Sequence, residues 1–133
     1  MTYKVIRTLL LVIVFVGVLV TYRTVIAEHN LSCEDAYDIK IYARCLVSEK
    51  WNESEWSAFD YIIEMESNWD STAQNPRSTA FGLGQFLDAT WETVGFEKTD
   101  NPRKQILATV KYIDQRYGSP QEAQNYWKRN KHY

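Results

Sequence analysis

Glu66 is the residue whose placement best suits acid–base chemistry in this sequence. It follows Phe59 by seven positions, Ile62 by four and Ile63 by three, so it falls on the apolar face of a predicted helix, near that helix's C-terminal end. Partial burial and the negative end of the helix dipole both disfavour an ionised carboxylate. The position therefore predicts a carboxyl group that carries its proton near neutral pH, as a general acid must. The pattern alone also fits an acidic residue that marks the edge of the helix.

Other acidic residues near Glu66 fit poorly as a second catalytic carboxylate. Glu64 is predicted to lie on the polar face of the same helix, and therefore in solvent. Asp70 and Asp88 are the nearest other candidates, but their positions are typical of a turn residue and of a helix-start residue. The sequence therefore favours chemistry that needs a single carboxyl group.

The sequence offers no recognisable site for a metal or an organic cofactor. Its 2 histidines, His29 and His132, lie near opposite ends of the chain, and neither has a metal ligand at a familiar spacing. It also has no phosphate-binding loop and no dinucleotide-binding pattern. We therefore expect neither a metal nor a cofactor.

Helix-capping residues and apolar periodicity divide the second part of the chain into short helices. Asn52 and Glu55 have the spacing of a capping box, and Pro102 and Pro120 each follow a capping residue, as first-turn prolines do. The segment 68–77 is rich in turn-forming residue types. The predicted helices cover residues 53–67, 88–94, 102–117 and 120–127, with residues 128–133 as a solvated tail. The sequence thus predicts a small all-α domain over residues 53–133.

Residues 28–52 are predicted to form a helical extension in front of that domain. Ser32 precedes acidic residues, as at a helix start, although the alternation of apolar residues that follows would also suit a strand. Cys33 and Cys45 both lie here. Twelve helical residues would hold them about 18 Å apart, whereas a disulfide needs Cα atoms within about 7 Å. A disulfide therefore requires the helix to begin after Cys33, and the sequence leaves the pairing open.

Residues 1–27 have the features of a signal peptide or a membrane-anchor helix. A nearly unbroken apolar run from Leu9 to Val20 follows Lys4 and Arg7. Its length is closer to that of a signal-peptide core than to the ~20 residues that cross a bilayer. Cleavage near Ala27 and retention as an anchor both stay open. In either case we expect an exported protein, anchored so that it faces the periplasm or the cell exterior, or secreted.

Two groups of motifs resemble known cell-wall enzymes. Glu66-Ser67-x-Trp69, followed by Ser78-x-Ala80-Phe81-Gly82-Leu83-Gly84-Gln85, closely resembles the glutamate-serine and glycine-leucine-x-glutamine motifs of the soluble lytic transglycosylase family. The later motifs are similar to the transglycosylase-like domain of aggregation-promoting factors and related phage and cell-wall proteins. They are Asn101-Pro102-Arg103-Lys104-Gln105, Tyr112-Ile113, Arg116-Tyr117-Gly118-Ser119 and Trp127. Together the resemblance covers about residues 56–133.

The resemblance implies a small lysozyme-like helical domain whose cleft binds the glycan strands of peptidoglycan. It implies Glu66 as the catalytic residue, with Ser67 orienting Glu66 or its helix. The substrate-binding groups that it implies are Ser67, Ser78, Gly82, Gln85 and Tyr112. Glycines at positions 82 and 84 would allow the backbone to approach a sugar ring, or would form a tight turn that supports the core.

Three functions are compatible with this sequence. The favoured one is a lytic transglycosylase that cleaves the MurNAc-GlcNAc β-1,4 bond and forms a 1,6-anhydro product with one glutamate as acid and base. A muramidase would hydrolyse the same bond and would need a second carboxylate facing Glu66. The third is a wall-binding protein without useful turnover. The enzyme could serve a secretion, conjugation or phage machine, and the membrane would be a partner if the N-terminal segment is retained.

Charge is distributed unevenly along the exported part. Residues 28–100 hold 5 basic and 15 acidic side chains, whereas residues 101–133 hold 7 basic and 2 acidic side chains. This pattern is atypical of a nucleic-acid-binding protein, so we expect no nucleic-acid partner. It fits either two solvated faces of opposite sign or a surface that docks to wall polymers.

Overall fold

Five α-helices and two turns of 3-10 helix make up the part of the chain that the computed structural model describes, residues 32–131. The α-helices are α2 (Ile39–Lys50), α3 (Trp56–Ser67), α4 (Asp88–Val94), α5 (Pro102–Tyr117) and α6 (Pro120–Asn130), and the 3-10 turns are η1 (Cys33–Asp35) and η2 (Glu53–Glu55). In this range the loop between α3 and α4 contains isolated β-bridges but no strand. The prediction of an all-α fold is confirmed.

The caps of α5 and α6 are the ones that the sequence predicted. Asn101 accepts hydrogen bonds from the backbone N–H groups of Arg103 (3.0 Å) and Lys104 (3.2 Å), and Ser119 accepts one from Glu122 (3.3 Å). Helices α4 and α5 have their predicted bounds. Helix α6 continues to Asn130, so the predicted end at residue 127 was too early, although residues 128–131 are exposed as expected of the tail.

Helix α2 begins at a cap that the sequence analysis did not identify. Asp38 Oδ1 accepts hydrogen bonds from the backbone N–H groups of Lys40 (2.8 Å) and Ile41 (3.1 Å). Ser32 accepts one from Glu34 (3.2 Å), but there it starts only the single turn η1. The preference for helix over strand is confirmed, whereas the predicted start at Ser32 was wrong by one short turn.

The late start of α2 meets the condition that a disulfide imposes on this segment. Helix α2 begins at Ile39, well after Cys33. Both Cys33 and Cys45 are disulfide-bonded, and neither is free. Their thiols are therefore unavailable as nucleophiles or metal ligands.

The start of α3 differs from the predicted capping box. Asn52 Oδ1 accepts a hydrogen bond from Ser54 N (2.9 Å), and the chain forms the 3-10 turn Glu53–Glu55 before the α-helix begins at Trp56. Side chains of this turn also bond elsewhere, because Glu53 pairs with Arg44 and Glu55 accepts from Gln121 N (2.8 Å). The predicted helix 53–67 is therefore a 3-10 turn followed by an α-helix.

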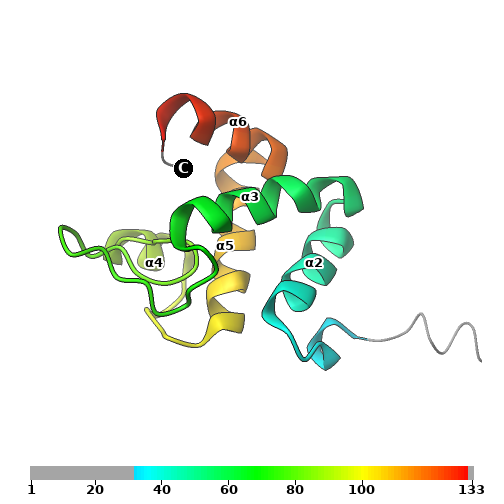
Figure 1. The fold of residues 1–133 in the computed structure, drawn as a ribbon, viewed down its shortest axis with the longest axis horizontal. Coiled ribbons are helices and arrows are strands. Elements are labelled where there is room, and N and C mark those ends of the chain that lie inside the picture. Colours follow the sequence, from blue (N-terminus) through cyan, green and yellow to red (C-terminus); the bar gives the residue numbers. More distant parts are fainter. Residues whose placement is uncertain (1–31, 132–133) are drawn as a thin grey trace, which may run out of the picture. The chain divides into compact units, whose positions relative to one another are not determined.

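Helix α3 lies at the centre of the unit formed by the helices after residue 36. It packs against α6 and α2, and α5 packs against α2, α6 and α4. Figure 1 shows α6 above α3 and α5 behind it, with α4 and the preceding loop on the opposite side from α2. The core takes apolar side chains from every α-helix, namely Tyr42, Ala43, Val47, Ala58, Phe59, Ile62, Ile63, Trp91, Val94, Ile106, Ala108, Ile113 and Ala123.

A buried glutamine on α5 holds the loop between α3 and α4. The side chain of Gln105 is 1% exposed, and its Oε1 accepts a hydrogen bond from Leu83 N (2.8 Å). Its Nε2 donates to the carbonyl oxygens of Ser71 (2.9 Å) and Thr99 (2.8 Å). Because the loop forms only isolated β-bridges, this amide supplies part of the pairing that a buried backbone requires.

The predicted export segment, residues 1–27, lies outside the described residues, as do His29 and His132. None of the helices between residues 32 and 131 is long and apolar enough to cross a membrane. Cleavage near Ala27 and anchoring therefore stay predictions.

We predict that Gln105→Ala strongly destabilises the domain. The substitution leaves the buried N–H group of Leu83 and the part-buried carbonyl groups of Ser71 and Thr99 without this partner, and an unsatisfied buried group costs about 1–3 kcal/mol. Urea unfolding followed by circular dichroism measures the loss. Gln115→Ala is the matched control, because Gln115 is exposed on the same helix and should change stability by no more than about 0.5 kcal/mol. Equal effects of the two substitutions would contradict the role of Gln105.

Candidate active site

Glu66 lies in the last turn of α3, where the chain reverses direction. Helix α3 ends at Ser67, and Asn68 and Trp69 follow with φ angles of 51° and 61°. A positive φ is unusual for tryptophan, so other contacts must hold it. Trp69 Nε1 donates to Asp60 Oδ1 (2.9 Å), and its ring centroid lies 6.0 Å from that of Trp56. Trp69 thus anchors the reversal and defines the helix end that carries Glu66.

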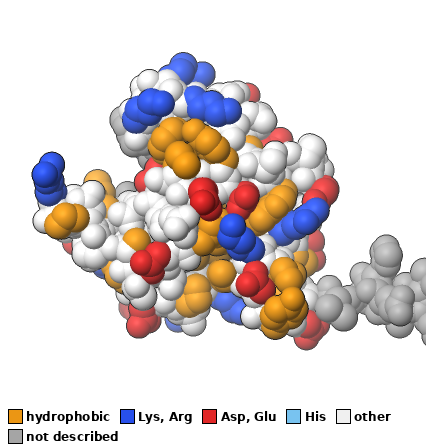
Figure 2. Space-filling view, viewed as in Figure 1, with side chains coloured by type: hydrophobic (Ala, Val, Ile, Leu, Met, Phe, Trp, Pro, Cys, Tyr) orange, Lys and Arg blue, Asp and Glu red, His pale blue; other side chains and the backbone are white. Residues whose placement is uncertain are grey.

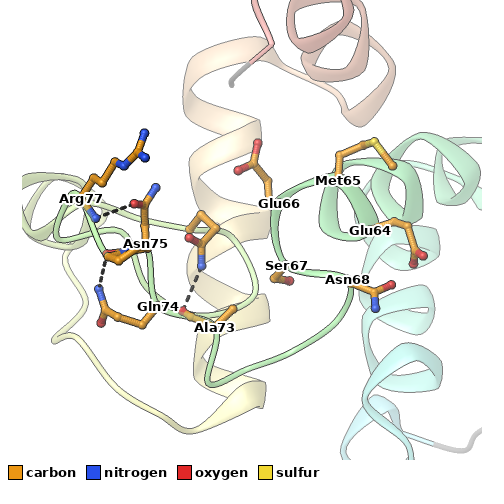
Figure 3. Close-up of a pocket in the computed structure, with 11 residues that line it drawn as sticks. Glu64, Met65, Glu66, Ser67, Asn68, Ala73, Gln74, Asn75 and Arg77 are labelled. Carbon is orange, nitrogen blue, oxygen red and sulfur yellow. Dashed lines mark hydrogen bonds between the residues drawn. The ribbon is translucent and has the colours of Figure 1, made fainter.

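Two cavities meet at Glu66. The first, of about 670 Å³, lies between the end of α3 and the following loop, and Ser67 and Gln85 also line it (Figure 3). The second, of about 400 Å³, is lined by Glu66 and Gln85 together with Tyr112 and Arg116. Because Glu66 and Gln85 line both, we regard the cavities as two arms of one cleft, with the Glu66 carboxyl group at their junction.

Trp127 on α6 holds the Glu66 carboxyl group. Its indole Nε1 donates to Glu66 Oε1 at 2.7 Å, and its ring lies edge-on to Tyr61 at a centroid distance of 5.5 Å. A hydrogen bond from a donor to a carboxylate fixes the orientation of that group and stabilises its charged form. The sequence analysis placed Trp127 in the family motif but did not pair it with Glu66.

Ser67 connects α3 to the loop behind the cleft. Its Oγ donates to the carbonyl oxygen of Leu83 at 2.9 Å, while Leu83 N donates to Gln105. The backbone of Leu83 is therefore held by α3 through its carbonyl group and by α5 through its N–H group. Ser67 also lines the first cavity, and the resemblance implied both an orienting and a binding role for it.

Gln85 faces both arms of the cleft and also closes the loop. Its Nε2 donates to the carbonyl oxygens of Ala73 (3.0 Å) and Gly82 (2.9 Å). These bonds hold Gln85 at a φ of 48°, which residues other than glycine seldom adopt. With both amide hydrogens engaged inside the loop, the side chain presents its carbonyl oxygen as the group that a ligand could use.

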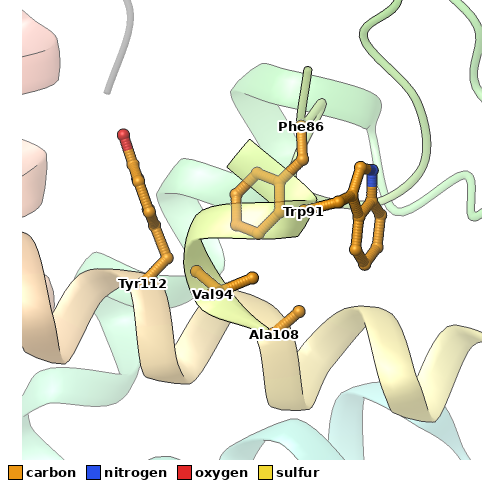
Figure 4. Close-up of a cluster of buried hydrophobic side chains, with 5 residues drawn as sticks. All are labelled: Phe86, Trp91, Val94, Ala108 and Tyr112. Atoms are coloured by element: carbon orange, nitrogen blue, oxygen red, sulfur yellow. The ribbon is translucent and has the colours of Figure 1, made fainter. Parts of the chain in front are cut away.

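Tyr112 lines the second cavity from α5. Its ring packs against Phe86, at a centroid distance of 5.0 Å, in a buried cluster with Trp91, Val94 and Ala108 (Figure 4). Figure 4 also shows the Tyr112 hydroxyl group pointing away from this cluster. Tyr112, which the resemblance placed in the cleft, thus forms part of the wall of the second cavity.

Gly82 and Ser78 line neither cavity, unlike the other predicted site residues. A Cβ atom on Gly82 would lie 2.6 Å from Gln105 Cδ, so the glycine makes room for a protein side chain instead of a sugar ring. Ser78 is exposed, and its Oγ accepts a hydrogen bond from Ala80 N (3.2 Å) within the loop. Both residues therefore stabilise the loop. For Gly82 the structure favours a tight turn that supports the core over an approach of the backbone to a sugar ring.

Glu66 is the only carboxylate among residues 32–131 that lines both cavities. Glu64 lines the first cavity, but its side chain points away from Glu66 (Figure 3). Its Oε2 atom lies 3.9 Å from Lys40 Nζ. Asp70 and Asp88 line neither cavity. The Thr72 hydroxyl and backbone N–H groups donate to Asp70 and lower the pKa of its carboxyl group, and Asp88 pairs with Lys98 at 2.9 Å.

The second cavity is bordered by a cation and tyrosine rings. The nearby Tyr112 raises the pKa of the Arg116 guanidinium above its ordinary value. Burial raises the pKa of the Tyr117 phenol above its usual range, so this hydroxyl stays neutral at any physiological pH. Within the described part of the chain, no cluster of three potential metal ligands lies at the cleft. The chemistry available there is that of one carboxyl group beside a fixed positive charge.

A family model described as Transglycosylase SLT domain matches residues 46–130. The comparisons with curated proteins and with solved structures found no match. The matched range contains every residue that lines the two cavities, from Glu64 to Arg116.

We predict that Gly82→Ala destabilises the domain more than Gly118→Ala does. Both glycines have positive φ angles, 77° and 82°, so alanine strains the backbone at either position, at a cost of about 1–2 kcal/mol. Only at position 82 would the new Cβ also collide with Gln105, whereas position 118 is open. Chemical denaturation of the two variants isolates the difference. Equal losses would mean that the close approach of Gly82 to Gln105 has no energetic consequence.

Proposed function

The chain belongs to the transglycosylase SLT family, and we propose that it is a peptidoglycan lytic transglycosylase with Glu66 as its single catalytic acid and base. Membership in this family of small, all-α, lysozyme-like domains indicates peptidoglycan cleavage of the lytic transglycosylase type. The observation that carries the finer proposal is the position of Glu66, whose carboxyl group lies at the junction of both cleft arms.

The reaction needs one proton donor that can take the proton back. The Glu66 carboxyl group protonates the glycosidic oxygen as the bond from the MurNAc anomeric carbon breaks. The resulting carboxylate then removes the proton from the 6-hydroxyl group of the same sugar, whose oxygen attacks the anomeric carbon and closes a 1,6-anhydro ring. Glu66 ends protonated, as it began, and no water is consumed. The nucleophile belongs to the bound substrate, so it needs no separate activation site.

Trp127 supports the carboxylate stage of this cycle. Its N–H group holds Glu66 Oε1 in place and stabilises the carboxylate that forms when the proton leaves. The contact comes from α6, which packs along α3, so the orientation of the acid depends on the packing of two helices. Trp127 acts through Glu66 and is a positioning residue.

The arrangement of acids favours a transglycosylase over a muramidase. A hydrolase of the usual kind needs a second carboxylate across the scissile bond from the acid. In the described region Glu64 points away from Glu66, and Asp70 and Asp88 serve a turn and an ion pair. Gln85 instead offers a carbonyl oxygen near Glu66, which suits a hydrogen bond from a sugar hydroxyl or acetamido group.

The proposed site of action is outside the cytoplasmic membrane. The predicted export segment of residues 1–27 supports this localisation. Lys and Arg side chains gather over α6, as Figure 2 shows, and Lys128, Arg129 and Lys131 are the exposed basic residues at its end. A positive face of this kind would attract peptidoglycan, whose peptide stems carry carboxylates.

We predict that Glu66→Gln abolishes glycan cleavage. Removal of a general acid lowers the rate by about 100- to 10,000-fold, and glutamine cannot transfer the proton. Mass spectrometry of muropeptides released from purified peptidoglycan should find 1,6-anhydro ends with the wild type only. Glu92→Gln is the matched control, because Glu92 is exposed on α4 outside both cavities. Hydrated ends would identify a muramidase, and a wild type that binds strands without releasing products would identify a wall-binding protein.

We predict that Trp127→Phe lowers kcat about 10- to 100-fold with little change in KM. Phenylalanine keeps an aromatic ring beside Tyr61 but removes a hydrogen bond to a charged group, which contributes about 1.5–3 kcal/mol. Trp51→Phe is the matched control, because Trp51 donates a similar indole hydrogen bond to Gly118 O (2.6 Å) away from the cleft. A loss of kcat in the control as large as in Trp127→Phe would assign the effect to general destabilisation.

A further inference from the structure

Arg116 lies beside three tyrosine rings in the second arm of the cleft. Its guanidinium carbon lies 5.6 Å from the ring centroid of Tyr112, 5.5 Å from that of Tyr117 and 5.9 Å from that of Tyr126. All three distances are within the range of cation–π attraction. Tyr112 and Arg116 line the same cavity as Glu66. The Arg116 side chain is exposed, so a ligand in the cavity can reach its guanidinium group while the rings contact it.

No ion pair within residues 32–131 involves Arg116. Cations elsewhere in the domain do form ion pairs, as Arg44–Glu53 and Lys50–Asp114 illustrate. Arg116 instead hydrogen-bonds the Tyr126 side chain. A guanidinium group has five N–H donors, so donors remain for a ligand. The second cavity thus holds a guanidinium group with donors left for a ligand, and the carboxyl group that lines this cavity with it is the proposed catalytic one of Glu66.

From this arrangement we propose that Arg116 binds a carboxylate of the substrate, and that this contact makes the cleft select acidic glycan strands over neutral ones. The guanidinium fork matches a carboxylate in two parallel hydrogen bonds. Within the proposed function, on which this inference rests, peptidoglycan supplies such a group on its peptide stem, or on the lactyl ether of muramic acid where the stem has been removed. Neutral polymers of N-acetylglucosamine supply none.

A structural role for Arg116 makes a different prediction. A cation in the last turn of α5 would also stabilise that helix through its dipole, and the guanidinium packs on tyrosine rings. In that case its removal would lower the stability of the domain and slow the cleavage of every glycan to the same extent. The selection between acidic and neutral strands separates the two roles.

The test compares native peptidoglycan with the same material after carbodiimide coupling to methylamine, which neutralises its carboxylates. For the wild type we expect kcat/KM to be about tenfold higher on native strands, in line with one partly exposed charged hydrogen-bonded pair. Arg116→Gln should lose about tenfold on native strands and nothing on neutralised strands. Arg116→Lys keeps the charge without the fork and should retain part of the preference, and it serves as the second variant if Arg116→Gln does not fold.

Lys104→Gln is the charge-matched control, because Lys104 is exposed on the same helix as Arg116 and lines neither cavity. It should keep the full preference for native strands. A third substrate, strands stripped of peptides by an amidase, distinguishes the sources of the carboxylate. The amidase frees the lactyl carboxylate as it removes the stem, so stripped strands carry only that group. Stripped strands cleaved as slowly as neutralised ones would identify the peptide stem as the ligand, and stripped strands cleaved as fast as native ones would show that Arg116 also binds the lactyl carboxylate.

Two results would overturn the inference. Equal cleavage of native and neutralised strands by the wild type, with 1,6-anhydro ends from both, would refute the role of Arg116 and leave the proposed function intact. Equal losses in Arg116→Gln on both substrates would assign Arg116 a structural role. If the wild type released no product from any strand, the proposed function would fail and the inference with it.

Discussion

The candidate active site depends on two hydrogen bonds to the backbone of Leu83. Its N–H group donates to the buried Gln105 side chain of α5, and its carbonyl group accepts from Ser67, the residue after Glu66 on α3. The loop between α3 and α4 has no helix or strand of its own, so these bonds fix its position relative to the acid. Gly82 is required next to them because any larger residue would collide with Gln105. The cleft is thus built from loop backbone held between two helices.

The elements that local signals determine could be predicted from the sequence. Asn101 and Ser119 are caps followed by proline, and α5 and α6 begin where these signals lie. Glu66 was identified by its place on the apolar face of α3 and by the family motif. Local signals failed at Ser32 and Asn52, where a cap was present but began only one turn of 3-10 helix. In both cases a cap fixes the first turn, whereas packing decides how far the helix continues.

The parts of the site that depend on long-range contacts could not be predicted. Trp127 and Glu66 are 61 positions apart, and their hydrogen bond depends on how α6 packs on α3. From the sequence alone, Gly82 fits a glycine that contacts a sugar as well as a glycine that makes room for a packed side chain. Only the position of Gln105 in the fold distinguishes the two. The environment of Arg116 likewise comes from two helices, because Tyr126 belongs to α6. Motifs therefore located the cleft, whereas tertiary packing assigned the roles within it.

The central claim is that Glu66 activates a nucleophile that the substrate itself carries, so that water takes no part in bond cleavage. Digestion of purified peptidoglycan in water labelled with heavy oxygen tests this directly, with mass spectrometry of the newly formed muramic acid ends. If Glu66 acts in this way, these ends are 1,6-anhydro ends without label. Incorporation of the label at the anomeric carbon of every new end would contradict it, because water would then be the nucleophile and a second catalytic group would be needed to activate it.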